Sequence, residues 1–325
     1  MSDAWRLIVR EPGGVDAIER EDIELPTPGV GELRIRNQAV GVNFIDIYYR
    51  TGLYPAPSPI LMGTEGAGIV EAVGEGVTDF APGDRIAYFA KRGSYATHVV
   101  ADAVRSFLLP DTLDSETAAA ALLKGLTAWS LVERCARVEP GQSVLVHAAA
   151  GGVGSILVQW LKAIGAHVIA HSGSPEKAAV ATRLGADVSL HGSFDALAAA
   201  VRAATDGRGV HAVLDGVGKD SWDASLASIA KRGIIVSYGN ASGPVPPIAP
   251  LLLARAGSIF LNRPTVYDWI ELPGDRAHGW NRLTEMLASG AVKIEIGQRY
   301  PLADAAEAHR ALESRKTVGA TVLLP

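Results

Sequence analysis

The fold is decided by the stretch Ser143-Val144-Leu145-Val146-His147-Ala148-Ala149-Ala150-Gly151-Gly152-Val153-Gly154. An apolar strand pattern runs here through a Gly-rich turn into a helix with an apolar face. We expect Gly151 to let the backbone approach a pyrophosphate and Gly154 to let the helix pack closely on the strand. The helix N-terminus would present free N–H groups and a positive dipole end to the anion. The alternative is a tight β–α turn without a ligand.

Strands and helices alternate along the chain after Gly141. Apolar strands separated by amphipathic helices are typical of a doubly wound parallel sheet, because both faces of such a sheet are covered. The pattern therefore predicts a Rossmann domain. Its predicted strands are Ser143–His147, His167–Ala170, Val188–Leu190, Ala212–Asp215, Ile234–Ser237 and Ser258–Leu261, and its predicted helices are Gly152–Ile164, Pro175–Leu184 and Asp195–Ala204.

The two ends of the chain have a different pattern. Short apolar runs bounded by turns predict β structure in the first third, before an Ala- and Leu-rich helix begins near Ser115. The stretch from about Pro264 is expected to pack back onto this first domain, and 325 residues are enough for two cores. The predicted early strands include Leu33–Arg36, Ala67–Val73 and Arg85–Phe89, and the late elements are helices Trp280–Ser289 and Ala303–Leu312 and strand Gly319–Leu324.

Composition excludes several function classes. The formal net charge is -5 and 20% of the residues are charged, so the chain has no basic field that would attract nucleic acid. The only cysteine, Cys135, excludes an intrachain disulfide. Residues 1–6 lack the order of a signal peptide, and no apolar run reaches the roughly 18–20 residues that cross a bilayer. We therefore expect a cytoplasmic protein with no membrane or nucleic-acid partner.

Cofactor choice depends on the end of the second strand. NAD-selective Rossmann domains carry an acidic side chain there, about twenty residues after the Gly-rich turn, that binds the ribose 2′-hydroxyl. This chain has no acid at that place but a lysine nearby that could face a 2′-phosphate, which favours NADPH. Lys177 could instead be a solvated residue of the first helical turn. The segment is His171-Ser172-Gly173-Ser174-Pro175-Glu176-Lys177.

Neither a metal nor a side-chain nucleophile is expected. Catalytic zinc normally takes three protein ligands from His, Cys and carboxylate, whereas the single Cys135 fits a buried apolar position and the eight histidines are scattered singly. No serine has the Gly-x-Ser-x-Gly setting of a nucleophile elbow. Hydride transfer needs neither group, because the cofactor supplies the electrons.

Several long motifs occur in the order found in one family. They are Gly41-Val42-Asn43-Phe44-Ile45-Asp46-Ile47-Tyr48-Tyr49-Arg50-Thr51-Gly52-Leu53-Tyr54-Pro55, Gly63-Thr64-Glu65-Gly66-Ala67-Gly68, Pro82-Gly83-Asp84-Arg85, Leu123-Lys124-Gly125-Leu126-Thr127-Ala128, His147–Gly154, Val236-Ser237-Tyr238-Gly239-Asn240 and Glu313-Ser314-Arg315. With these motifs the chain resembles the zinc-independent quinone oxidoreductases of the medium-chain dehydrogenase/reductase superfamily, which include the zeta-crystallins. The resemblance covers essentially the whole chain. Zinc-dependent alcohol dehydrogenases share the frame but have ligands, a cysteine and a histidine, where Asn43 and Thr64 stand.

The resemblance implies an architecture and a set of site residues. A GroES-like β-barrel catalytic domain would comprise residues 1–126 and 264–325, and an NADPH-binding, doubly wound Rossmann domain residues 127–263. Asn43 and Tyr48 would border the nicotinamide, while Lys177, His191 and Arg315 would approach the 2′-phosphate, although His191 and Arg315 could be surface side chains. The other implied cofactor contacts are Thr127, Gly151, Gly152, Val153, Gly154, Gly173, Ser174, Val217, Tyr238, Gly239 and Asn240.

The implied activity is metal-free reduction of a quinone by NADPH. We expect hydride to pass to a planar electrophile in the cleft between the domains, with Asn43, Tyr48 and Tyr54 as hydrogen-bond donors near its oxygens. Water or Tyr54 would supply the proton, although Tyr54 could equally be a packing residue. One alternative is reduction of the double bond of an enal or enone. Another is a non-catalytic, crystallin-like protein that binds NADPH or RNA, and the acidic balance argues against RNA.

A homodimer is also expected. The apolar run Ile259-Phe260-Leu261 would lie at the sheet edge if it is the last strand of the Rossmann domain. Unpaired apolar edges commonly find a partner, and a second copy of the chain is the simplest one.

Overall fold

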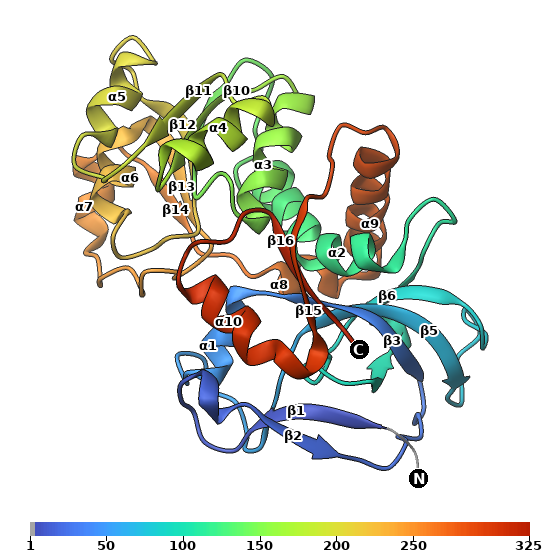
Figure 1. Cartoon of the computed structure of the whole chain (residues 1–325). Coiled ribbons are helices and arrows are strands. Elements are labelled where there is room, and N and C mark those ends of the chain that lie inside the picture. Colours follow the sequence, from blue (N-terminus) through green and yellow to red (C-terminus); the bar gives the residue numbers. More distant parts are fainter. Residues whose placement is uncertain (1–3) are drawn as a thin grey trace. The chain divides into compact units, whose positions relative to one another are not determined.

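The computed structural model describes residues 4–325, which form two compact units (Figure 1). The first unit comprises the residues up to Leu123 together with Ile294–Pro325, and the second unit comprises Lys124–Lys293. Residues 1–3, on which the expected lack of a signal peptide partly depends, lie outside the described residues. None of the helices in the described part of the chain has the length and apolarity needed to span a bilayer.

A parallel sheet of six strands, in the order β11-β10-β9-β12-β13-β14, forms the centre of the second unit. The chain enters the sheet in the middle, winds outward to one edge, and then returns to build the other half, which is the doubly wound arrangement. Every neighbouring pair can run parallel because a connection long enough for a helix joins the strands. The strands are β9 (Ser143–His147), β10 (His167–Ser172), β11 (Val188–His191), β12 (Val210–Asp215), β13 (Ile229–Ser237) and β14 (Phe260–Asn262).

Helices cover both faces of this sheet, with α3 on one side and α5, α6 and α7 on the other (Figure 1). Leu145 and Val213 of the strands share one buried cluster with Val201 of α5 and Trp222 of α6. Alternate strand residues, such as Val144, are equally buried on the opposite face, so the strands are apolar throughout. The helices are α2 (Ser115–Trp129), continued by a wider turn at Ser130–Cys135, then α3 (Gly152–Ala163), α4 (Pro175–Arg183), α5 (Leu197–Ala203), α6 (Trp222–Ser228), α7 (Pro250–Arg255), α8 (Val266–Glu271) and α9 (Pro273–Ala288).

Helices α8 and α9 belong to the second unit, whereas the sequence pattern placed residues 264–293 with the first domain. The reason is a close approach between α9 and α2. A Cβ atom added at Gly279 would lie 2.8 Å from the ring of Trp129, and one added at Gly125 would lie 2.4 Å from Leu283. Two glycines therefore let these helices touch. As a result the second unit runs from residue 124 to residue 293, whereas the expected domain ran from 127 to 263.

The first unit contains a seven-stranded sheet in the order β15-β16-β3-β5-β6-β8, with β7 paired to β3, and a small sheet β2-β1-β4. Strand β3 pairs with β5 along most of its length, with β7 near its start and with β16 at its end. The last strand of the chain thus completes a sheet begun near its start. The strands are β1 (Trp5–Val9), β2 (Glu19–Asp22), β3 (Glu32–Val42), β4 (Ile60–Leu61), β5 (Glu65–Val73), β6 (Arg85–Phe89), β7 (His98–Asp102), β8 (Ser106–Leu108), β15 (Ile296–Pro301) and β16 (Ala320–Leu324).

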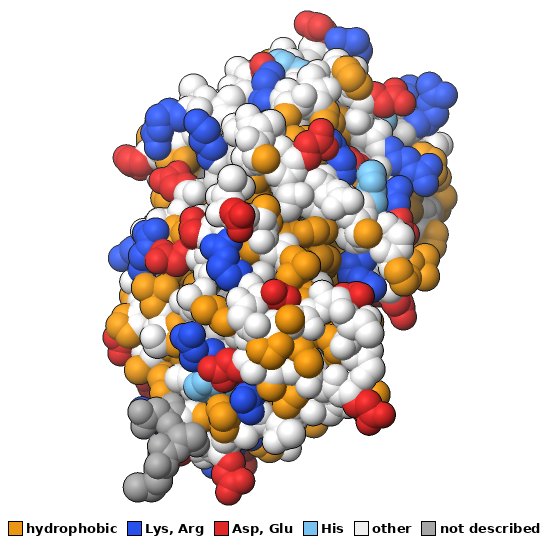
Figure 2. Space-filling model, turned by 90° about the vertical axis from the view of Figure 1, so that its right-hand side faces the viewer, with side chains coloured by type: hydrophobic (Ala, Val, Ile, Leu, Met, Phe, Trp, Pro, Cys, Tyr) orange, Lys and Arg blue, Asp and Glu red, His pale blue; other side chains and the backbone are white. Residues whose placement is uncertain are grey.

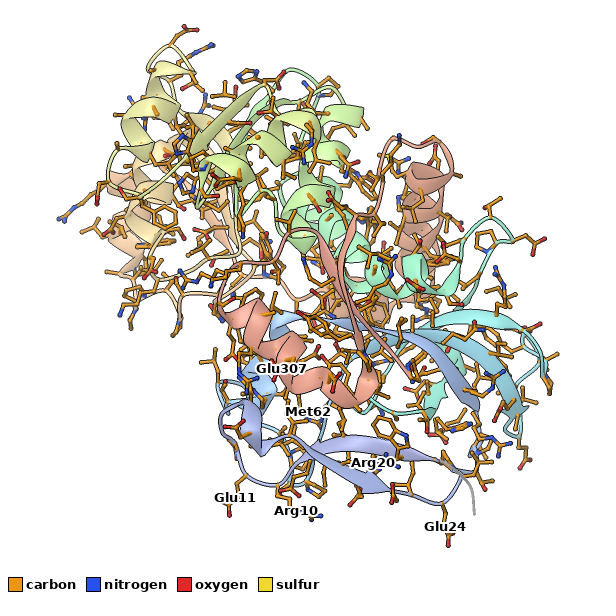
Figure 3. The ribbon with its side chains drawn as sticks, viewed as in Figure 1. Arg10, Glu11, Arg20, Glu24, Met62 and Glu307 are labelled. Atoms are coloured by element: carbon orange, nitrogen blue, oxygen red, sulfur yellow. The ribbon has the colours of Figure 1, made fainter. Side chains whose placement is uncertain are left out.

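Two helices complete the first unit, α1 (Phe44–Arg50) and α10 (Ala305–Glu313). Met62 lies in the core cluster with residues of α10 and points into the unit, whereas Glu11 and Glu24 point away from it (Figure 3). This separation of apolar and charged side chains is what a buried core requires.

The expected fold class is confirmed, since a mixed sheet domain accompanies a doubly wound parallel sheet. The predicted strands of the second unit are all present, with shifts of one or two residues at most of their ends, whereas β13 begins at Ile229 instead of the predicted Ile234. The pattern did not predict β1, β2, β4, β7, β8, β15, α1, α6, α7 and α8, where β7 is His98–Asp102 and β8 is Ser106–Leu108. Strand β2, for example, is Glu-Arg-Glu-Asp and has no apolar alternation, so only its pairing with β1 makes it a strand.

Candidate functional site

The Gly-rich turn has the geometry of an anion-binding loop. Strand β9 ends at His147, Ala148 adopts a left-handed conformation with φ of 50°, and α3 begins after Gly151. A Cβ atom at Gly154 would lie 2.2 Å from the carbonyl oxygen of Ala148, so this position excludes any side chain. Gly152 and Val153 form an incompletely buried first turn without an acidic residue. The N–H groups of this turn are therefore available to a phosphate.

A second group of predicted residues gathers at the ends of β10 and β11. Ser172 and His191 are register neighbours in these two strands. Ser174 caps α4 by accepting a hydrogen bond from the backbone N–H of Lys177 at 3.4 Å. The Lys177 side chain is half-buried, and this burial lowers the pKa of its ammonium group. The structure thus brings Gly173, Ser174, Lys177 and His191 to one corner of the sheet.

The loops after β12 and β13 are interlocked and contain the remaining predicted contacts of this unit. The backbone N–H of Tyr238 donates to the carbonyl oxygen of Asp215 at 2.8 Å. A Cβ atom at Gly239 would lie 2.4 Å from the carbonyl oxygen of Gly216. Val217, Tyr238, Gly239 and Asn240 therefore share the edge at which the parallel strands end, together with the Gly-rich turn.

The sequence pattern did not indicate how these loops are held. Asp215, which ends β12, is only 1% exposed and accepts hydrogen bonds from the backbone N–H groups of Val217 and Gly218 at 2.8 and 3.2 Å. The segment Asp215-Gly216-Val217-Gly218 does carry a signal, because an acidic residue at a strand end before glycines is typical of a turn that accepts its own N–H groups.

In the first unit, Asn43 stands immediately before α1 and is 8% exposed. Its amide nitrogen donates to Glu65 at 2.7 Å, and the other oxygen of Glu65 accepts the backbone N–H of Leu123 at 2.7 Å. Gly41 makes room for this carboxylate, because a Cβ atom there would lie 2.3 Å from it. Asn43 is thus a buried and oriented amide, not a mobile loop side chain.

An aromatic cluster surrounds the other two predicted catalytic residues. The rings of Tyr48 and Tyr54 lie 5.2 Å apart at 61°, and the backbone N–H of Tyr54 donates to the carbonyl oxygen of Tyr48 at 3.0 Å. Tyr54 also meets Tyr49 at 5.9 Å, and Phe44 lies 6.2 Å from Tyr48. These contacts fix the ring of Tyr54 although its loop contains no regular element.

The comparisons with known proteins agree with both units. Residues 29–111 match the model "Alcohol dehydrogenase GroES-like domain", and residues 152–285 match "Zinc-binding dehydrogenase". A quinone oxidoreductase of Pseudomonas aeruginosa is 45% identical over 96% of this chain and 97% of its own. The chain belongs to the quinone oxidoreductase family.

Solved structures extend the similarity. The Escherichia coli quinone oxidoreductase in complex with NADPH is 38% identical and superposes with a TM-score of 0.96 over 99% of this chain and all of its own. A 2-haloacrylate reductase of Burkholderia is 37% identical over 98% of both chains. The chain is therefore similar over its whole length to enzymes whose names give different substrates, a quinone and a 2-haloacrylate.

The zinc named in one family description does not fit the residues of this chain. The amide of Asn43 donates to Glu65, and the hydroxyl of Thr64 donates to Asp46 at 3.1 Å. Neither group is a usual zinc ligand. Cys135 is mostly buried in the second unit, and this burial raises the pKa of its thiol to about 11. Among residues 4–325 no group of three His, Cys, Asp or Glu side chains could hold a metal.

Two further predicted residues lie on or next to helices, one in each unit. Thr127 is half-buried in α2, and its carbonyl oxygen accepts the hydroxyl of Ser130 at 2.8 Å. Arg315 is exposed in the first unit, follows the end of α10 and has a left-handed φ of 57°. The backbone near it is anchored by a bond of 2.6 Å from the buried guanidinium of Arg50 to Glu313.

Asp46 is a buried acid that the sequence pattern missed. Its carboxyl group accepts hydrogen bonds from the backbone N–H of Asn43, the hydroxyl of Thr64 and the hydroxyl of Tyr95. Burial outweighs these bonds and raises the pKa of Asp46 from 3.8 to about 7. Tyr95 also lies 3.0 Å from His309, whose pKa is lowered to about 3 by burial, so this imidazole is neutral.

This raised pKa makes a testable contribution to the stability of the fold. Between about pH 4 and 7 the native state keeps a proton on Asp46 that the unfolded chain has lost, so wild-type stability declines as the pH rises through this window. We expect the free energy of unfolding of the wild type to fall by roughly 2–4 kcal/mol relative to that of Asp46→Asn across this range, in urea titrations at each pH. The exposed Asp111→Asn should follow the wild type, and parallel curves for the wild type and Asp46→Asn would contradict the expectation.

Proposed function

We propose that the protein is a quinone reductase that uses NADPH and no metal. The observation that carries this proposal is the edge of the second sheet, where the Gly-rich turn, the Lys177 corner and the interlocked loops after β12 and β13 converge. The full-length similarity to an Escherichia coli quinone oxidoreductase crystallised with NADPH supports it. The site fits the cofactor for two reasons. Gly154, which has no side chain, lets α3 start directly against the turn, and Gly152 and Val153 of the turn are partly exposed.

In this proposal the residues of the turn, from Gly151 to Gly154, hold the pyrophosphate through N–H groups of α3. Ser174, Lys177 and His191 would bind the 2′-phosphate, with Gly173 leaving space for it and Arg315 adding charge. Burial lowers the pKa of the Lys177 ammonium group, and a charged group at a half-buried site interacts with an anion more strongly than a fully solvated one. The remaining contacts would come from Thr127, Val217, Tyr238, Gly239 and Asn240.

Bound NADPH supplies a hydride, and the protein residues do the rest. Asn43 and Tyr48 would orient the nicotinamide and the acceptor, while the hydroxyls of Tyr48 and Tyr54 would donate to the acceptor oxygens. Hydride addition leaves a quinone as a hydroquinone anion, which needs one proton to become the hydroquinone. Water or the hydroxyl of Tyr54 would provide it. Because the reduced oxygens hold charge well, positioning and a few donors could supply most of the rate enhancement.

A second candidate is reduction of an activated carbon–carbon double bond. The observation that favours it is the similarity over the whole chain to an enzyme named 2-haloacrylate reductase. The same hydride geometry serves both reactions, so the acceptor decides between them.

Steady-state oxidation of the cofactor tests the proposal. We expect faster turnover of NADPH with 1,2- and 1,4-quinones than with a panel of enals, enones and 2-haloacrylate, and a higher kcat/KM for NADPH than for NADH. Faster turnover of the alkenes would replace the quinone assignment with the second candidate. Tight binding of NADPH without turnover of any acceptor would support a binding protein instead.

The role of Tyr54 is tested separately. If its hydroxyl donates the proton, Tyr54→Phe should lower the single-turnover rate of hydroquinone formation about tenfold or more, as loss of a general acid typically does. Tyr49→Phe removes a neighbouring hydroxyl from the same aromatic cluster and should leave the rate within about twofold. A wild-type rate in Tyr54→Phe would assign the proton to water.

We also propose a cytoplasmic homodimer that has small molecules as its substrates. The described surface supports the absence of a nucleic-acid partner, because acidic and basic side chains are interspersed on the face shown in Figure 2. A dimer is supported by β14, which ends the sheet order, and by Phe260, which is 63% exposed on it. An apolar side chain on an unpaired edge strand favours association with a second edge.

Light scattering at micromolar concentration tests the dimer. The wild type should have twice the mass of the chain, and Phe260→Glu should reduce the mass to that of a monomer because it places a charge on the edge strand. Leu272→Glu is a matched control, since Leu272 is also 63% exposed but lies outside the sheet. A monomeric wild type would refute the proposal.

A further inference from the structure

Asp215 is a buried carboxylate with an unusual set of partners. Its oxygens accept the backbone N–H groups of Val217 and Gly218, the hydroxyl of Ser221 at 2.7 Å and the hydroxyl of Ser225 at 2.7 Å. The side chain is 1% exposed. Burying a carboxylate is costly unless its lone pairs are satisfied, so such a concentration of neutral donors on one group has a structural purpose.

The first consequence concerns the loop after β12. Two successive N–H groups bound to the carboxylate fix the backbone from Gly216 to Gly218. This loop in turn holds the loop after β13, because the carbonyl oxygen of Val217 accepts both the backbone N–H of Ser242 at 2.8 Å and its hydroxyl at 2.9 Å. The Asp215 side chain therefore anchors one loop directly and the other through its neighbour.

The second consequence reaches the Gly-rich turn. Ser225 lies 2.9 Å from Nε2 of His147, the residue that ends β9 and precedes Ala148. A carboxylate can only accept, so the single hydroxyl proton of Ser225 goes to Asp215, and His147 must donate its Nε2 proton to Ser225. Burial lowers the pKa of His147, so the imidazole is neutral and holds its one proton on Nε2. Asp215 thus selects the tautomer of His147 through Ser225, which is 78 positions away from His147 in the chain.

This Ser–His–Asp arrangement is not a nucleophilic site. His147 and Ser225 are 0% exposed, so no substrate reaches them. What they connect is the end of β9 to the end of β12.

We propose that Asp215 is the positioning residue of the cofactor site: one carboxylate sets the loop after β12 directly, the loop after β13 through Val217, and the strand that enters the Gly-rich turn through Ser225 and His147. The proposal rests on the proposed function, because it assigns these loops to NADPH. Asp215 acts through the loops, and no contact with the cofactor is required of it.

Substitutions at Asp215 separate this role from a purely structural one. Asp215→Ala removes every acceptor, and we expect the Kd for NADPH, from fluorescence titration of the folded protein, to rise about tenfold to a hundredfold. Asp215→Asn keeps one oxygen for Val217 and Gly218, so its Kd should stay within about threefold of the wild type. Asp223→Asn is the control: it removes an exposed carboxylate from helix α6, the helix that contains Ser225, and should leave the Kd unchanged.

The tautomer of His147 provides a readout that needs no cofactor and covers the case in which Asp215→Ala does not fold. In Asp215→Asn the new amide N–H donates to Ser225, so Ser225 must donate to His147, whose proton moves to Nδ1. Imidazole ¹⁵N spectra, with the signal assigned by its absence in His147→Asn, should show Nε2–H in the wild type and Nδ1–H in Asp215→Asn.

The contrary results fall into two groups. The inference about Asp215 would be overturned, and the proposed function left standing, by an unchanged tautomer in Asp215→Asn, by wild-type affinity in Asp215→Ala, or by equal loss of affinity in both variants. Failure of the wild type to bind NADPH would overturn the proposed function and this inference with it.

Discussion

The contact between Gly154 and the carbonyl oxygen of Ala148 is the constraint on which the rest of the second unit depends. Helix α3 begins so close to the end of β9 that a single methyl group would separate them. This approach places the N-terminus of α3 at the carboxyl edge of the sheet. Because the neighbouring strands are parallel, the loops after β10, β12 and β13 arrive at the same edge.

Buried carboxylates organise both units in a similar way. Asp215 in the second unit and Glu65 and Asp46 in the first accept hydrogen bonds from backbone N–H groups and from side chains of distant segments. Such bonds constrain direction as well as distance, so a loop held by a carboxylate keeps one conformation. The two carboxylates next to Asn43 and Thr64 also explain how a frame shared with zinc enzymes stays ordered with an amide and a hydroxyl at these positions.

The separation of tasks between the units follows from this arrangement. In the second unit, the Gly-rich turn and the loops after β12 and β13 lie at one edge of the sheet, where dinucleotides bind in this fold. The first unit contains an aromatic cluster and an oriented amide at the start of α1. Relatives that share the chain over most of its length bear the names of enzymes for different acceptors, a quinone and a 2-haloacrylate, so the shared fold does not by itself decide the acceptor.

The sequence by itself determined the elements whose signals are local. The strand Ser143–His147, the Gly-rich turn, the alternation of strands and helices and the lack of an acid after β10 all lie within short windows, and periodicity or spacing reports them directly. The resemblance implied the roles of Asn43, Tyr48 and Tyr54, although the sequence pattern did not predict helix α1, which begins directly after Asn43.

Tertiary structure alone decided the contacts between distant segments. The bond from His147 to Ser225, the bonds from Thr64 and Tyr95 to Asp46 and the packing of α9 on α2 join residues between 18 and about 150 positions apart, and no periodicity records such pairs. The physical reason is that burial and hydrogen bonding depend on which side chains meet in space, whereas a sequence pattern records only which side chains are neighbours along the chain.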